Sequence, residues 1–410
     1  MTVGFTSDGL AALEAVLARH VSSGAVPGLV ALVARGGQVH VSCAGRLALG
    51  DSAPVTSDAI FRIASLTKPV IGVAAMLLAE EGTLALDDPV ERWLPELGRR
   101  RVLRRYDAEL SDTVPAQRAI TVEDVLSFRL GFGLIFTPGP LPVTAAETEF
   151  GLKTLGPPWP PSPLTPDQWI AAFGSLPLLD QPGERWRYNT GATVTGILVE
   201  RAAGAPLAEV LRKRVFEPLG MTDTGFYVPK GKLGRFTSMY APAEVAAVFG
   251  ASEDAPAEHG LVLIDRPGGW YAAPPALPDG ASGLVSTAGD LAAFAAMLAG
   301  DGGSLLSPAS VALMLRDRTT ARDRAENPWF FGEHLGWGLM MSVPAAGSGP
   351  ARASGLPRGY GWEGGSGTAW RTDPAAGLTG ILLTTRMMTS PEPTEVARDF
   401  WSAAYAAIAP

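Results

Sequence analysis

Extended apolar segments stand near both ends of this chain, and their placement limits the possible folds more than any other feature. Near the N-terminus, the β-branched runs Leu29–Ala34 and Val39–Cys43 are separated by Arg35–Gln38, whose two glycines are typical of a hairpin. Near the C-terminus, the pattern predicts three strands, at residues 337–343, 365–372 and 378–388, the last two joined by the turn Asp373–Gly377. We therefore expect the two chain ends to share one antiparallel sheet.

The region between these strands favours helices. Apolar periodicity and capping residues predict helices from Thr6 or Ser7 at the N-terminus and over residues 65–81, 88–97, 121–131, 190–203, 207–216, 287–298 and 393–408. Gly82 and Gly204 are the expected C-caps of two of them. The fold class predicted is α/β of the α+β type: a sheet built from both chain ends and flanked by helices, plus a mostly helical lobe.

A chain of 410 residues is too long to fold around one hydrophobic core of typical size, so we expect two lobes. Residues 1–95 and 280–410 should form a discontinuous α/β lobe, and residues 96–279 a helix-rich lobe. Nine prolines between Pro138 and Pro166 predict an irregular loop within residues 132–169. Ligands prefer clefts between lobes, and Phe132 and Trp159 are therefore candidates for the wall of a substrate pocket.

Charge and cysteine content exclude several functional classes. The net charge is −8, and the one basic run, Gly98–Arg105, is interpreted as a solvated face, so nucleic acid is not an expected partner. Cys43 is the only cysteine, which excludes a disulfide framework and a thiolate metal cluster, and we expect it to be a small buried residue.

No part of the chain predicts a membrane segment or an export signal. No uninterrupted apolar stretch is long enough to span a bilayer, and the first residues resemble an amphipathic helix. The expected location is therefore cytoplasmic, with no membrane partner, and nothing in the sequence specifies an oligomeric state.

Ser65 and Lys68 stand three residues apart where the long apolar helix begins. This spacing puts the amine one turn above the hydroxyl, where it could take the hydroxyl's proton and make the serine a nucleophile. Free N–H groups at a helix start also favour developing negative charge. A serine-lysine pair at this spacing also arises by chance, so its position after a hairpin is what gives it weight.

Three segments together, Phe61–Lys68 (FRIASLTK), Pro182–Thr190 (PGERWRYNT) and Gly361–Trp370 (GWEGGSGTAW), resemble the serine β-lactamase and penicillin-binding-protein superfamily. The resemblance is strongest to class C β-lactamases and family VIII carboxylesterases. It implies that Ser65 is the acylated nucleophile and that Lys68 and Tyr188 share the role of general base. A phenol, with a pKa of about 10, can act as a base only where a nearby cation lowers that pKa. The alternative for Tyr188 is simple packing at a helix entrance.

The chain departs from the superfamily pattern in two motifs. Thr190 stands where asparagine is usual, which puts recognition of amide substrates in doubt. Trp362, Glu363 and Gly364 stand where relatives carry a Lys-Thr-Gly or His-x-Gly motif, so the usual cation is missing. We therefore expect neutral or hydrophobic acyl groups as substrates, contacted by these residues. By resemblance, the backbone N–H groups of Ser65 and Gly365 would form the oxyanion hole. The glycines also fit a bulged edge strand.

Other chemistries lack support in the sequence. The four histidines, His20, His40, His259 and His334, lie in no catalytic motif, and no Gly-x-Ser-x-Gly elbow, zinc motif, Rossmann fingerprint or Walker loop occurs. The prediction is a carboxylesterase that cleaves small to medium esters and needs no cofactor or metal. The alternatives are an acyltransferase of a biosynthetic pathway, a β-lactamase or D,D-peptidase, and a non-catalytic binding or sensor module.

Overall fold

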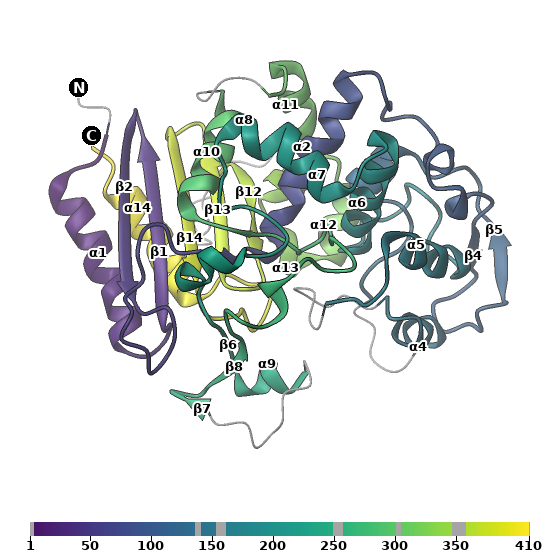
Figure 1. The fold of residues 1–410 in the computed structure, drawn as a ribbon. Helices are drawn as coiled ribbons and strands as arrows, with labels where there is room; N and C mark the ends of the chain where they lie inside the picture. The colour runs from purple at the N-terminus through teal and green to yellow at the C-terminus, as the bar shows by residue number, and fades with distance from the viewer. Residues whose placement is uncertain are drawn as a thin grey trace.

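A seven-stranded antiparallel sheet forms the centre of the computed structural model, which describes residues 4–135, 141–152, 161–248, 257–300, 305–346 and 358–409 (Figure 1). Its strand order is β10-β11-β12-β13-β14-β1-β2. The bounds are β1 Gly28–Arg35, β2 Gln38–Gly45, β10 Leu335–Trp337, β11 Ser342–Pro344, β12 Tyr360–Gly364, β13 Thr368–Asp373 and β14 Leu378–Thr384. Because β1 pairs with both β2 and β14, the predicted sharing of one sheet by the two chain ends is confirmed.

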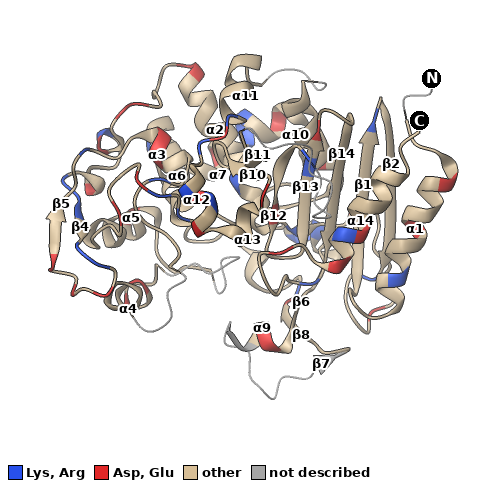
Figure 2. Cartoon of the chain, turned by 180° about the vertical axis from the view of Figure 1, so that it is seen from behind, with Lys and Arg blue, Asp and Glu red and all other residues tan. Residues whose placement is uncertain are grey.

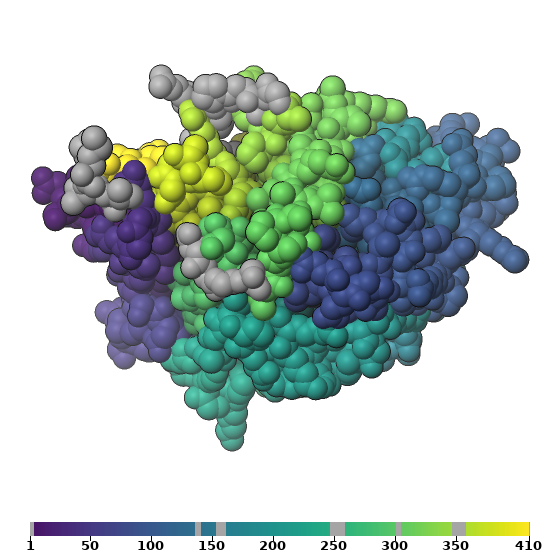
Figure 3. All heavy atoms as spheres, turned by 90° about the horizontal axis from the view of Figure 1, so that it is seen from above, coloured from purple at the N-terminus to yellow at the C-terminus, as the bar shows by residue number. Residues whose placement is uncertain are grey.

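The two termini also meet directly. The Thr6 amide donates to the Ala407 carbonyl (2.9 Å), and the Ala409 amide donates to the Gly4 carbonyl (2.9 Å). In the space-filling view the purple N-terminal segment accordingly lies against the yellow C-terminal one (Figure 3). The ends of the chain thus close the α/β lobe.

Helices cover both faces of the sheet because its strands are apolar on both sides. Leu29, Ala31 and Val33 of β1 pack with the helices α1 (Ser7–Ser22) and α14 (Glu395–Ala406). Val30 and Leu32 point the opposite way, into the larger core that contains α2 (Thr67–Glu80) and α10 (Ala288–Ala299). This alternation is the period-two pattern of a strand buried on both faces.

The second, mostly helical part lies beside the sheet, with α4 (Pro142–Glu149) and α5 (Pro166–Ser175) at the end of the molecule opposite β1 and β2 (Figure 1). Its other helices are α3 Val122–Leu126, α6 Thr190–Ala203, α7 Leu207–Leu211 and α8 Glu217–Leu219, with a π-helical turn at Arg212–Phe216. The remaining helices are α9 Ala243–Val248, α11 Pro308–Met314, α12 Ala321–Glu326 and α13 Pro328–Phe331. Three small sheets pair β3 (Phe61–Arg62) with β9 (Val285–Ser286), β4 (Arg101–Leu103) with β5 (Thr113–Pro115), and β8 (Leu261–Asp265) with β6 (Met239–Pro242) and β7 (Ala257–Glu258). The exact domain boundaries stay a prediction.

Several predicted elements differ from the structure. The strand expected at 337–343 is the hairpin of β10 and β11, because the chain turns at Met340, whose φ is +64°. The helix expected at 88–97 is two 3₁₀ turns, Val90–Arg92 and Pro95–Leu97, since the Asp88 carboxylate accepts from the Ala85 amide instead of capping. The helix from Thr121 ends at Leu126, and the helix expected at 207–216 breaks at Leu211 into the π-helical turn.

The proline-rich region is more regular than expected. It contains α4 and the start of α5, and both helices begin with a proline at one of their first positions, where its missing N–H costs nothing. Thr165 and Gln168 form a capping box that starts α5. The prediction of an irregular stretch over 132–169 is therefore wrong for these described helices.

Two residue-level predictions are also corrected. Cys43 is exposed, because it lies on β2 at the edge of the sheet, where no helix covers its side chain. The basic run is not simply a solvated face, since Arg100 is buried and donates to the Leu176 carbonyl (2.6 Å), while residues 101–103 form β4. Acidic and basic residues are interspersed over both parts of the chain (Figure 2).

None of the helices in the described ranges is long and apolar enough to cross a bilayer. The same ranges contain no cluster of three His, Cys, Asp or Glu side chains placed to hold a metal ion.

Candidate active site

Ser65 lies in a sharp turn between β3 and α2. The turn requires Ala64 to adopt a left-handed conformation, with φ of +44°, which is unfavourable for any residue with a Cβ. Ile63 is held on one side, where its amide donates to the Leu284 carbonyl (3.0 Å). A 3₁₀ turn over Ala64–Leu66 then leads into α2 at Thr67, so Ser65 precedes the α-helix that the sequence predicted it would start. The strained turn presents Ser65 at the junction of the sheet and the helical part.

The side chains of Lys68 and Tyr188 meet at the Ser65 hydroxyl. Lys68 Nζ donates to Ser65 Oγ over 2.8 Å, and Tyr188 Oη donates to the same oxygen over 2.8 Å. Tyr188 comes from the segment that leads into α6, 123 residues away along the chain. The structure thus brings together the three residues that the sequence singled out, and it places both candidate bases within proton-transfer distance of one hydroxyl.

The two candidate bases differ in their electrostatics. Lys68 is completely buried, and this burial lowers its pKa to about 7, although the negative charge of Asp279 opposes the shift. Burial raises the pKa of Tyr188 above its usual value, and the charge of Glu363 adds to that rise. At neutral pH the amine can therefore be unprotonated while the phenol keeps its proton. This differs from the expectation that cations would lower the pKa of Tyr188.

Trp362 contacts Tyr188 through its polar edge. Its indole Nε1 donates to Tyr188 Oη over 3.0 Å, and its ring stacks on Phe330 with centroids 6.1 Å apart. Phe330 also packs on the Tyr188 ring (4.8 Å). A neutral donor thus holds the phenol oxygen where related motifs carry a cation, and an aromatic group lies beside Ser65.

The glycine-rich turn between β12 and β13 is attached to the chain just before Ser65. Ser366 Oγ donates to the Arg62 carbonyl (2.6 Å), and Thr368 Oγ1 donates to the Ile63 carbonyl (3.0 Å). A Cβ at Gly364 would lie 2.4 Å from the Ile63 carbonyl oxygen, so only glycine permits this approach. The turn that contains Gly365 is thereby brought beside Ser65, within the sheet and not at its edge.

Replacing Gly364 with alanine is expected to lower kcat/KM at least about tenfold, because displacing a catalytic group by an ångström costs up to about 10²-fold. The added Cβ has to push the turn away from Ile63. Initial rates of ester hydrolysis measure the effect. Gly268→Ala is the matched control, since its Cβ meets no atom within 4 Å. Equal rates for the two variants would show that the turn does not position the site.

Three other residues predicted to contact a substrate, Glu363, Phe132 and Thr190, lie as follows, and their contact with a substrate stays a prediction. Glu363 forms a bidentate ion pair with the buried Arg371, with Nε–Oε1 and Nη2–Oε2 distances of 2.8 and 3.0 Å. Phe132 is buried in the helical core against Phe173, with centroids 5.1 Å apart. Thr190 is the first residue of α6, and among the described residues no hydrogen bond joins it to Lys68. Trp159 lies outside the described residues.

The sequence did not reveal the group that holds Lys68. Its Nζ donates to the Ala281 carbonyl over 2.7 Å, a contact between residues 213 positions apart. Asp279 and Thr193 lie directly behind this carbonyl. The only signal was an acid within the small-residue segment Asp279–Gly283. The sequence also did not reveal Phe330 as a site residue, because two adjacent aromatic residues in a short helix are equally typical of a hydrophobic core.

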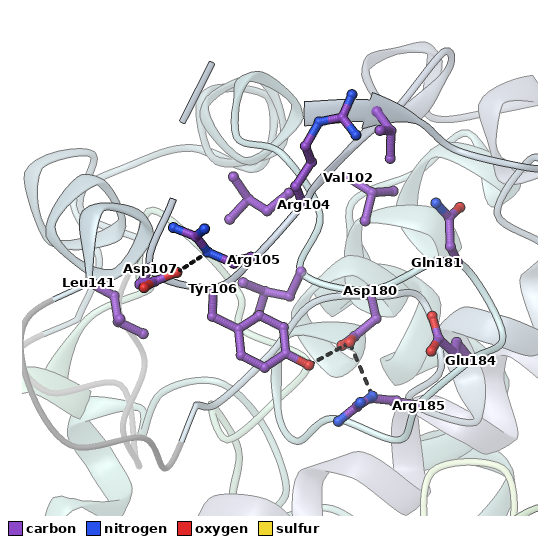
Figure 4. Close-up of a pocket in the computed structure, with 13 residues that line it drawn as sticks. Val102, Arg104, Arg105, Tyr106, Asp107, Leu141, Asp180, Gln181, Glu184 and Arg185 are labelled. Atoms are coloured by element: carbon purple, nitrogen blue, oxygen red, sulfur yellow. Dashed lines mark hydrogen bonds and ion pairs between the residues drawn. The ribbon is translucent and has the colours of Figure 1, made fainter. Parts of the chain in front are cut away.

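A cavity of about 760 Å³ is lined by residues of 102–107 and 179–185, with Val114 and Leu141 (Figure 4). Its polar lining is internally paired: Tyr106 Oη donates to Asp180 Oδ1 (2.7 Å), and Arg185 pairs with the same carboxylate. Arg187, the residue directly before Tyr188, joins this network by donating to Tyr106 Oη (2.6 Å). Ser65 is not among the residues that line this cavity, so the network supports the Tyr188 segment from outside the site.

Comparisons with known proteins find relatives over most of the chain. The chain is 38% identical to Protein Rv1367c of Mycobacterium tuberculosis over 339 residues, covering 80% of this chain and 78% of the relative. It is 31% identical to Esterase EstB of Burkholderia gladioli over 380 residues, covering 91% and 90%. Among solved structures, EstCE1, described as a hydrolase with promiscuous acyltransferase activity, superposes with a TM-score of 0.78 at 25% identity, covering 97% of this chain and 99% of that one. The Beta-lactamase family model matches residues 13–404, and the chain therefore belongs to the Beta-lactamase family, with its β-lactamase/transpeptidase-like fold.

Proposed function

We propose that this protein is a serine carboxylesterase of the family VIII type. The observation that carries the proposal is the Ser65 hydroxyl, which accepts hydrogen bonds from both Lys68 and Tyr188 at 2.8 Å. Because the pKa of Lys68 is about 7, its amine is partly neutral at physiological pH and can accept the Ser65 proton. The similarity to Esterase EstB over nine-tenths of the chain supports an ester substrate.

The proposed reaction has two acyl-transfer steps. Ser65 Oγ attacks the ester carbonyl as its proton moves to Lys68, and the resulting oxyanion is held by the N–H groups of Ser65 and Gly365. The alcohol leaves with a proton passed through Tyr188, whose high pKa keeps it protonated and able to donate. Water then attacks the acyl-enzyme and gives its proton to the same relay. The bond between the acyl carbon and Ser65 Oγ breaks, Ser65 Oγ takes up that proton, and the acid is released.

A neutral, hydrophobic acyl group fits this site best. Trp362, Tyr188 and Phe330 form a continuous aromatic surface, and the Trp362 indole is a neutral donor where a substrate carboxylate would need a cation. This arrangement supports esters over β-lactams and peptides. Trp362 and Phe330 are thus the proposed acyl contacts, and the cytoplasmic location stays a prediction.

Acyl transfer to an alcohol or amine is the second candidate. It is favoured by the relatives named acyltransferases, including calJ of Penicillium decumbens, which is 25% identical over 90% of this chain. The chemistry is shared up to the acyl-enzyme, and only the final acceptor differs.

One set of rate measurements tests both candidates. Turnover of p-nitrophenyl butyrate should exceed that of nitrocefin by a large factor, and intact mass should show an acyl adduct on Ser65 during turnover. Adding a short-chain alcohol separates the two candidates: a constant acid yield supports hydrolysis, and conversion of the acyl group to a new ester supports transfer. Comparable nitrocefin turnover would contradict the proposal.

Replacing Phe330 with alanine is expected to lower kcat/KM for octanoate esters about tenfold more than for acetate esters. The reason is that a longer acyl chain loses apolar contact worth about 25 cal/mol per Å² of buried surface. A chain-length series of p-nitrophenyl esters provides the measurement. Phe150, which is 37% exposed at the end of α4, supplies the control Phe150→Ala. A uniform loss over the series would assign Phe330 a structural role instead.

A further inference from the structure

Asp279 is a buried carboxylate that the reaction described above does not use. It is 2% exposed, and its Oδ1 accepts from Thr193 Oγ1 (2.7 Å) and from the Ala281 amide (3.0 Å). Its Oδ2 accepts from Ser282 Oγ (3.2 Å). Among the described residues, no lysine or arginine lies within ion-pair distance of this carboxylate. A buried carboxylate without a direct cation is costly, so its place in the structure needs an explanation.

One residue connects Asp279 to Lys68. The amide of Ala281 donates to Asp279, and its carbonyl accepts from Lys68 Nζ (2.7 Å). The segment from Asp279 to Ala281 therefore contains the negative carboxylate and also the carbonyl that accepts the hydrogen bond from the buried amine of Lys68. Hydrogen bonds in such a chain polarise one another, which strengthens both.

The segment has little room to move. A Cβ at Gly280 would lie 2.5 Å from the Ala192 carbonyl oxygen and 3.2 Å from the Cα of Gly196, both on α6. Glycine thus allows the segment to press against α6, where Thr193 reaches Asp279. The position of the Ala281 carbonyl is set jointly by this contact and by the carboxylate.

We propose that Asp279 is a positioning residue for Lys68, which aims the Ala281 carbonyl at the amine and balances the charge that the amine gains when it takes the Ser65 proton. The proposal rests on the esterase function proposed above and extends it. By family resemblance, an asparagine at position 190 would help to hold the lysine. The proposal gives this role to the Asp279 carboxylate and the Ala281 carbonyl. Thr190 does not perform this role, whereas Thr193 supports Asp279.

The charges around Lys68 are consistent with this assignment. Burial lowers the pKa of Lys68, and Asp279 is the charged group that raises it. Among the described residues, the other titratable group that contacts the amine is Tyr188, whose ring centroid lies 4.6 Å from Nζ and whose phenol remains neutral. Tyr271, also neutral, feels the charge of Asp279, as well as those of Arg62 and Asp265. Removing the charge of Asp279 should therefore make the amine a weaker base.

The protonation of Lys68 can be measured without any turnover. The chain has only five lysines, so ¹³C labelling of lysine side chains gives few NMR signals, and the Lys68 signal is the one absent in Lys68→Met. In Asp279→Asn, which keeps the shape of the side chain, we expect the titration midpoint of Lys68 to fall by about one pH unit. Asp290→Asn is the matched control, because Asp290 is also buried and accepts from Thr224 Oγ1 (2.7 Å). An unchanged Lys68 midpoint in folded Asp279→Asn would overturn the proposal.

Kinetics provide the second test. The acidic limb of the kcat/KM profile should move to lower pH in Asp279→Asn by the same amount as the midpoint. Thr193→Val removes one hydrogen bond from the carboxylate and keeps its charge, so kcat should fall about tenfold with KM unchanged, and Thr193→Ser should restore it. An unchanged kcat in Thr193→Val would overturn the positioning role. This test remains available if Asp279→Asn does not fold. Absence of ester turnover in the wild type, together with the shifted NMR midpoint, would contradict the esterase function alone.

Discussion

Replacing Ser65 with alanine is expected to lower kcat/KM for ester hydrolysis by about 10⁴-fold or more, as for other serine enzymes that lose their nucleophile. The expectation follows from the geometry, since Ser65 Oγ accepts from both Lys68 and Tyr188. No acyl-enzyme can form without this oxygen. The measurement is the initial rate with p-nitrophenyl butyrate for the two proteins purified identically, with intact mass to detect the adduct.

The control for this prediction is Ser175→Ala. Ser175 is the exposed last residue of α5, where its hydroxyl donates to the Ala172 carbonyl (2.7 Å). This variant should keep wild-type activity, and both variants should unfold within a few degrees of the wild type. If Ser65→Ala retained a tenth of the activity, the nucleophile would have to be another group, and the proposed function would fail.

Replacing Lys68 with methionine is expected to lower kcat/KM by about 10²- to 10⁴-fold, the usual contribution of a general base. Methionine fills the buried space of the lysine stem without a charge, so the fold should be retained. The wild type should also lose activity as the pH falls below about 7, because the amine becomes protonated and can no longer accept the Ser65 proton. In Lys68→Met this acidic limb should disappear. A pH series of kcat/KM for both proteins gives the measurement.

Lys213→Met is the matched control for Lys68→Met. Lys213 is exposed and pairs with Glu209 on the surface, where such a contact is worth little. It should leave the rate and the pH profile unchanged. Retention of the acidic limb in Lys68→Met would mean that another group titrates there and that Lys68 is not the base.

The core of the site was predictable because its motifs are local. Ser65 and Lys68 are three residues apart, in a 3₁₀ turn and the α-helix that directly follows it, so local helical geometry places them together. Tyr188 could be added only through resemblance, since nothing in the sequence measures a distance across 123 residues. The substrate contacts expected of Phe132, Thr190 and Glu363 stay predictions, since a motif does not specify which way a side chain points toward a substrate.

The fold was predictable at the level of strands and their shared sheet, but less so for short elements. The strands of β1, β2 and β14 carry strong apolar patterns, and these patterns persist whatever surrounds them. The hairpin of β10 and β11 looked like one strand, since the turn at Met340 is stabilised by a long-range hydrogen bond from its amide to the Leu126 carbonyl (3.0 Å). The exposure of Cys43 likewise depends on which strand ends at the edge of the sheet.

The sequence by itself determined the sheet built from both chain ends and the serine-lysine pair, because apolar periodicity and helical spacing act over a few residues. The family followed from the resemblance of three short motifs. Only the tertiary structure decided how the pKa values of the two candidate bases, Lys68 and Tyr188, differ. The burial that lowers the pKa of Lys68 and raises that of Tyr188 comes from packing α2, α6 and β12 together. The carboxylate of Asp279 reaches Lys68 through Ala281 only in the folded chain. The pKa of a group depends on its burial and on the charges near it. Both are set by segments that lie hundreds of residues apart in the sequence and meet only in the folded protein.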